Sequence, residues 1–64
     1  MLYAIVRNPL DNRQFFAGYR YTNAFAPHWS DDTMATYLTR ELAEAVASEL
    51  GEGIVVSIEL HYSK

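Results

Sequence analysis

The segment HWSDD, from His28 to Asp32, contains a histidine, a serine and two aspartates close together in the sequence. His28 and the two aspartates could together bind a metal ion, and His28 could activate the Ser30 hydroxyl as a nucleophile. The H-x-x-D-D spacing, however, lacks the geometry of two histidines on a helix or of an oxygen-rich calcium loop. Ser30 is not in a nucleophile-elbow context, and a chain of 64 residues has little room for a pocket that excludes water. We therefore expect no catalytic, metal or cofactor site, and no enzymatic activity.

The run Tyr19-Arg20-Tyr21 superficially resembles the aromatic residues on which some sheets stack nucleic-acid bases, with an arginine for phosphate. One arginine between two tyrosines is not a basic patch, and the chain has no glycine-rich phosphate loop. The simpler interpretation is that Tyr19 and Tyr21 point beneath a helix. Nucleic-acid binding stays an alternative, but we do not expect nucleic acid to be the main partner.

Trp29 is the only tryptophan, and it lies in a predicted loop beside Pro27. It could plug the open end of a small core, or it could be exposed and form an aromatic anchor of the kind found at protein-binding hot spots. In the second case we predict a partner-binding surface made of this loop together with either an exposed sheet edge or the acidic face of a helix. The candidate residues of this surface are Phe25, His28, Trp29, Asp31, Asp32, Glu41, Glu44 and Glu52.

The size and composition of the chain predict one small, marginally stable domain over residues 1–64. Apolar residues make up 50% of the sequence, which suffices for a packed core and argues against disorder. A chain of this length buries only about 60% of its unfolded surface, so oligomerisation or partner binding would supplement its stability. Cysteine is absent, which excludes a disulfide framework, a zinc-thiolate site and a thiol nucleophile.

The net charge of −3 is unevenly distributed along the chain. Residues 1–30 hold three arginines and one aspartate, giving +2, whereas residues 31–64 hold seven acids against one arginine and one lysine, giving −5. This polarity favours an oriented encounter with another charged protein over nonspecific adhesion to a phosphate backbone.

Two β-rich runs, Leu2 to Arg7 and Gln14 to Thr22, are separated by the turn-forming segment NPLDNR and predict an antiparallel hairpin. In the second run Phe16 is expected to face away from the core, and Gly18 to mark a bulge or a close approach of another side chain. The expected core face of this strand consists of Phe15, Ala17, Tyr19 and Tyr21.

The residues from Arg40 to Leu50 are strong helix formers, with Thr39 placed as the N-cap and Gly51 as the C-terminal cap. A short helical turn capped by Asp31 or Asp32 is expected over residues 31–36, with one uninterrupted helix from Asp32 as the alternative. The face expected to pack on the sheet consists of Leu42, Ala43, Val46, Ala47 and Leu50.

The segment from Ile54 to Tyr62 alternates apolar and polar residues and predicts the last strand, with Ile54, Val56, Ile58, Leu60 and Tyr62 inward and Ser57, Glu59 and His61 outward. The order strand, strand, helix, strand predicts an α+β ββαβ domain with one helix on one face of a three-stranded, mainly antiparallel sheet. We prefer the sheet order 2-1-3, and the order 1-2-3 is the alternative. The other face of the sheet is expected to be open to water or to a partner.

Taken together, the aromatic hairpin, HWSDD, the small-residue helix face of Ala35, Thr39, Ala43 and Ala47, and the closing strand IVVSIELHY resemble small uncharacterised proteins encoded by bacteriophages and prophages. The resemblance spans nearly the whole chain and rests on structural motifs. It implies a small acidic protein that binds and inhibits or redirects a host protein.

Three hypotheses follow from the sequence. The leading one is a non-enzymatic protein-binding module, a phage-type modulator or inhibitor of a host protein. The alternatives are a structural protein that forms a homodimer through a sheet edge and an accessory protein that binds nucleic acid. The short apolar run before Arg7 predicts a strand and neither a signal peptide nor a membrane span, so we expect a cytoplasmic protein, in the host cytoplasm if the chain is phage-encoded.

Overall fold

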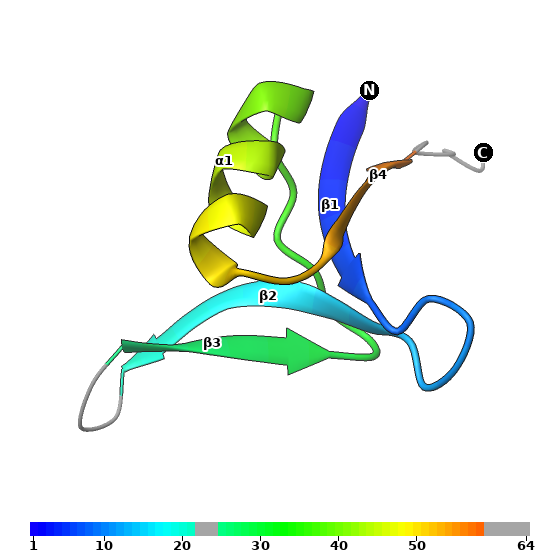
Figure 1. Ribbon diagram of the computed structural model, residues 1–64, viewed down its shortest axis with the longest axis vertical. Coiled ribbons are helices and arrows are strands. Elements are labelled where there is room, and N and C mark those ends of the chain that lie inside the picture. Colours follow the sequence, from blue (N-terminus) through cyan, green and yellow to red (C-terminus); the bar gives the residue numbers. More distant parts are fainter. Residues whose placement is uncertain (22–24, 59–64) are drawn as a thin grey trace, which may run out of the picture.

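The computed structural model describes residues 1–21 and 25–58. It contains one helix and a four-stranded sheet, so the α+β class is confirmed (Figure 1). The elements in chain order are β1 (Leu2–Arg7), β2 (Gln14–Tyr21), β3 (Phe25–Ser30), α1 (Arg40–Leu50) and β4 (Ile54–Ile58).

The sheet is antiparallel throughout and has the order β3-β2-β1-β4. The three predicted strands occupy the predicted relative order, because β1 lies between β2 and the last strand. The predicted count of three strands is wrong, because the segment from Phe25 to Ser30, interpreted as a loop, pairs with β2 and extends the sheet. The β2–β3 hairpin runs across the β1–β4 pair, and α1 lies alongside β1 (Figure 1).

Helix α1 has the predicted bounds and both predicted caps. The Thr39 side-chain oxygen accepts a hydrogen bond from the Leu42 amide at 3.1 Å, which satisfies one of the free donors of the first turn. The Gly51 amide donates to the carbonyls of Ala47 and Ser48 and closes the C-terminal end. The predicted face is right except at Leu42, which is 54% exposed.

The helical turn expected over residues 31–36 is wrong, and so is the alternative of a helix beginning at Asp32. This segment instead runs beside the sheet: the Ala35 amide donates to the Phe16 carbonyl at 2.8 Å, and Tyr37 exchanges two backbone hydrogen bonds with Tyr3. The connection thereby receives backbone partners from both β2 and β1, so it needs no helix to satisfy its polar groups.

A bulge in β2 changes which residues of that strand share a face. The β2–β3 register shifts between Phe16 and Tyr19, where Gly18 has a φ of 102°, as the sequence suggested. Phe16 and Tyr19 consequently contact each other, with ring centroids 5.3 Å apart. Phe16 is 1% exposed and belongs to the core, so the expectation that it faces away is wrong.

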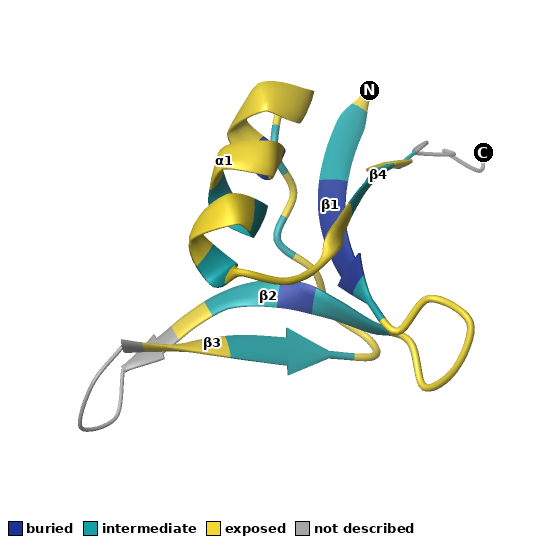
Figure 2. Ribbon diagram, in the orientation of Figure 1, coloured by how far each residue is buried: buried dark blue, intermediate teal, exposed yellow. Residues whose placement is uncertain are grey.

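The core lies between α1, β1, β4 and the β2–β3 hairpin, with Ile5, Phe16 and Ala43 fully buried at its centre (Figure 2). Ile5 pairs with Val55, and Val55 packs against this core. The partly buried residues around the centre are Tyr3, Trp29, Ala35, Tyr37, Val46, Ala47, Leu50 and Val55.

The expectation that Ile54, Val56 and Ile58 point to the core beneath the helix is also wrong. Residues opposite each other in an antiparallel pair share a face, and Val55, next to Val56 in the chain, is the residue that contacts the core. The face opposite the helix is therefore apolar as well, and it carries Leu2, Ala4, Val6, Phe15, Ile54, Val56 and Ile58. The predictions for Thr22, Glu59, Leu60, His61 and Tyr62 lie outside the described residues.

Candidate interaction surface

Trp29 lies in β3 directly opposite Phe16 of β2, and their rings meet edge to face with centroids 5.7 Å apart. The guanidinium of Arg7 lies 4.5 Å from the centre of the Trp29 ring. The same arginine donates to the Gln14 side chain at 2.9 Å and contacts the Glu52 carboxylate at 3.6 Å. Trp29 is thus engaged within the fold, so the structure supports its role as a plug of the core.

The segment predicted as a loop carrying the aromatic anchor of Phe25, His28 and Trp29 is a strand. All three residues lie in β3, and the neighbouring residues His28 and Trp29 point to opposite faces of the sheet. His28 is half-buried, and Phe25 begins the strand with its backbone paired to Tyr21.

The two aspartates that follow β3 are exposed, and the structure gives one of them a local role. The Ser30 hydroxyl donates to the Asp32 carboxylate at 2.7 Å and accepts hydrogen bonds from the amides of Asp32 and Thr33, each at 3.3 Å. This serine-centred turn ends β3 and takes the place of the predicted aspartate cap. Asp31 is exposed beside it.

The predicted acids of the second half fall into two groups. Glu41 and Glu44 are exposed on α1, three residues apart, so they share the solvated side of the helix (Figure 2). Glu52 lies in the turn before β4 and pairs with Arg7, which in turn covers Trp29. The structure therefore brings Glu52 and Trp29 together through an arginine that the predicted site did not include.

The two edges of the sheet differ in chemistry. On β3, Pro27 lies opposite Tyr19 and lacks an amide hydrogen; proline is tolerated at an edge where the missing donor faces away from the sheet. Such a residue discourages the addition of a further strand. On β4, the sequence Ile54-Val55-Val56-Ser57-Ile58 has neither a proline nor a charged residue. Among the described strands, β4 is therefore the edge without the usual protection against strand addition.

Side chains along β4 are accessible as well as apolar. Ile54 is 55% exposed, Ser57 is exposed, and Val56 and Ile58 are half-buried (Figure 2). The sequence predicts that this strand lies at an edge of the sheet, but strict alternation wrongly assigns its even-numbered residues to the core. Pro27 was the available signal: once its segment is recognised as a strand, the proline places that strand at one edge of the sheet.

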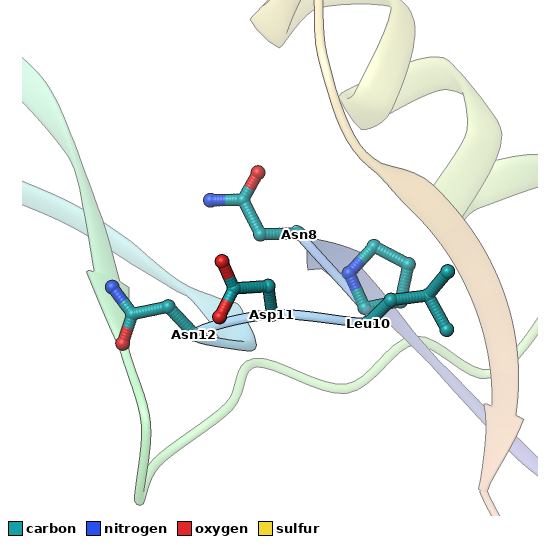
Figure 3. A pocket seen from close by; sticks show the side chains of 5 residues that line it. Asn8, Leu10, Asp11 and Asn12 are labelled. Carbon is teal, nitrogen blue, oxygen red and sulfur yellow. The ribbon is translucent and has the colours of Figure 1, made fainter.

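A shallow concavity of about 450 Å³ lies at the β1–β2 loop and is lined by Asn8, Pro9, Leu10, Asp11 and Asn12 (Figure 3). All five residues are exposed, so this hollow does not exclude water. Leu10 is fully exposed and extends away from the polar side chains of the loop (Figure 3).

Tyr37 is an ionisable residue whose surroundings shift its pKa. Burial raises the pKa of the Tyr37 phenol above its usual value of 10.0, and repulsion from the nearby Tyr19 side chain in its phenolate form adds to the rise. In the described part of the chain, no three histidine or acidic side chains come close enough together to hold a metal ion. Within the same residues, no helix has the length and hydropathy needed to cross a membrane.

Comparison with protein-family models, with curated proteins and with solved structures gave no match to this chain.

Proposed function

We propose that this chain is a small protein-binding module that accepts an extended polypeptide segment as an additional strand at the edge of β4. The observation that carries the proposal is the contrast between the two sheet edges: Pro27 protects β3, whereas β4 has neither a proline nor a charge. The loop surface predicted around Trp29 is not part of this proposal, because that tryptophan packs on Phe16 beneath Arg7.

Strand addition would supply both affinity and selectivity. Backbone amides and carbonyls of β4 would pair with those of the added segment, which gives affinity independent of its sequence. Selectivity would come from side chains on the face opposite the helix, where Ile54 is exposed beside the half-buried Val56 and Ile58. A segment with apolar residues at alternate positions fits this row.

The test is a matched pair of serine-to-lysine substitutions. Ser57→Lys places a charge on the β4 edge, whereas Ser48→Lys makes the same chemical change at an exposed position of α1. Peptides selected from a random library on the wild-type protein would be titrated against both variants, after circular dichroism has confirmed that the variants fold.

We expect Ser57→Lys to weaken peptide binding at least about tenfold, which corresponds to roughly 1.4 kcal/mol. Ser48→Lys should leave the affinity within about twofold, because a surface charge far from a contact has little effect. Failure to select any peptide, or equal affinities for the two variants, would contradict strand addition at β4.

A further inference from the structure

We infer that the strand added to β4 is the β4 strand of a second copy of this chain. This inference rests on the proposed function and names its partner. The two β4 strands would run antiparallel about a twofold axis. They would join the two sheets into one continuous sheet of eight strands, with the two β4 strands at its centre and a β3 strand at each edge.

The sequence of β4 is complementary to itself in one register. Centring the twofold axis on Val56 is the arrangement that pairs all five residues of the strand, and it places Ile54 opposite the partner's Ile58. Val56 then lies opposite the partner's Val56, so one face of the junction is an uninterrupted apolar row. In the sheet this row lies beside the β1 residues of the same face, of which Ala4 and Val6 are buried.

The charge distribution permits this contact. The chain carries a net charge of −3, so two copies repel each other at long range. The five residues of β4 contribute no charge to that repulsion, whereas the exposed Glu41 and Glu44 lie on the helix. Like charges are therefore absent from the strands that would touch.

The other edge explains why assembly would stop at two copies. An unprotected edge on both sides of a sheet leads to open-ended stacking of strands. Here Pro27 protects β3, so the pairing of two β4 strands leaves a closed dimer with a protected edge at each end.

The size of the core gives a reason for dimerisation. Among the described residues only Ala4, Ile5, Val6, Phe16 and Ala43 are buried. A chain of 64 residues with so few buried side chains is short of apolar burial, and oligomerisation is a common way to add it. Pairing through β4 would cover Ile54, which is 55% exposed in the single chain.

A single cysteine tests the register directly, because the natural chain contains none. In Val56→Cys, the twofold axis brings the two thiols opposite each other, with Cα atoms about 4.5–5.5 Å apart, which is within disulfide range. Mild oxidation should therefore convert most of this variant into a covalent dimer. Ser48→Cys, exposed on α1, is the control and should cross-link at least about tenfold more slowly.

Sedimentation equilibrium over a range of micromolar concentrations completes the test. We expect a wild-type dimer whose dissociation constant rises at least about tenfold in Ile54→Lys and Ser57→Lys but changes less than about twofold in Ser48→Lys. A wild-type monomer at all concentrations, or equal cross-linking of the two cysteine variants, would overturn the inference. A wild-type monomer that still binds selected peptides in a Ser57-dependent way would overturn the dimer alone. A wild-type protein that neither dimerises nor binds peptides would overturn the proposed function too.

Discussion

Gly53 lies where the chain entering β4 passes close to Ile5 of the core. A Cβ atom at this position would be 2.5 Å from Cγ2 of Ile5 and 3.3 Å from the Trp29 ring. Its φ of 105° is also unfavourable for residues other than glycine. This glycine therefore lets Trp29 of one edge strand approach the start of the other.

Gly18 provides a matched comparison for Gly53. Its φ of 102° is nearly the same, but a Cβ atom there would have no neighbour within 4 Å. We expect Gly18→Ala to lower the free energy of unfolding by about 1 kcal/mol through backbone strain alone. Gly53→Ala should cost roughly 1–3 kcal/mol more, because Ile5 and Trp29 must also move.

Urea denaturation followed by circular dichroism measures both free energies. Equal losses of stability in the two alanine variants would contradict the close approach of Gly53 to Ile5.

The sequence predicts best the residues whose role is local. Thr39, Gly51 and Gly18 fulfil the predicted roles of N-cap, C-terminal cap and bulge, because each role is fixed by neighbours in the chain. It failed at Phe16 and Ile54, whose burial depends on which strand lies opposite. The bulge at Gly18 shifts the face of β2 by one residue, and strict alternation cannot anticipate that shift.

At the scale of elements, α1 is held at its N-terminal end by a single side-chain hydrogen bond, from the Leu42 amide to the Thr39 hydroxyl oxygen. We expect Thr39→Ala to lower the free energy of unfolding by about 1 kcal/mol, and Thr39→Ser to lower it by only a few tenths, because serine retains the acceptor. Urea denaturation of the two variants measures the difference. An alanine variant as stable as the serine variant would show that the cap contributes nothing.

The elements with strong periodicity could be predicted from the sequence, and β3 could not. The bounds of β1 and α1 agree with the prediction. The apolar run of β1 is followed by turn-forming residues, and the helix formers of α1 lie between the caps Thr39 and Gly51. The segment FAPHWS has no alternation and contains a proline, so it was interpreted as a loop. Its strand conformation comes from pairing with β2, which is a tertiary effect that local propensity does not record.

The edge strand β4 shows the same limit for the candidate site. Both the strand and its place at an edge of the sheet could be predicted from the sequence, but which of its faces is exposed follows from the way Ile5 pairs with Val55. The residues first predicted to bind a partner were aromatic and acidic. The structure places Trp29 against Phe16 and pairs Glu52 with Arg7, and it leaves an apolar strand open instead.

At the scale of the whole molecule, the net charge of −3 predicts how salt acts on the proposed dimer. Raising the ionic strength from 0.01 M to 0.15 M shortens the Debye length from about 30 Å to about 8 Å and screens the repulsion between copies. We expect the dimer to tighten on the order of a few-fold, as measured by sedimentation equilibrium at each salt concentration. Weakening of the dimer by salt would indicate an interface held by ion pairs, which β4 does not contain.

The central claim, that β4 pairs with the β4 strand of a second copy, is tested most directly by amide hydrogen exchange at Ile54–Ile58. In a strand with one neighbour, alternate amides bond to that neighbour and the others exchange with water, whereas a strand with two neighbours protects consecutive amides. We predict consecutive protection at high protein concentration and alternating protection after dilution. Alternating protection of β4 at every concentration in the wild type would contradict the pairing of two β4 strands.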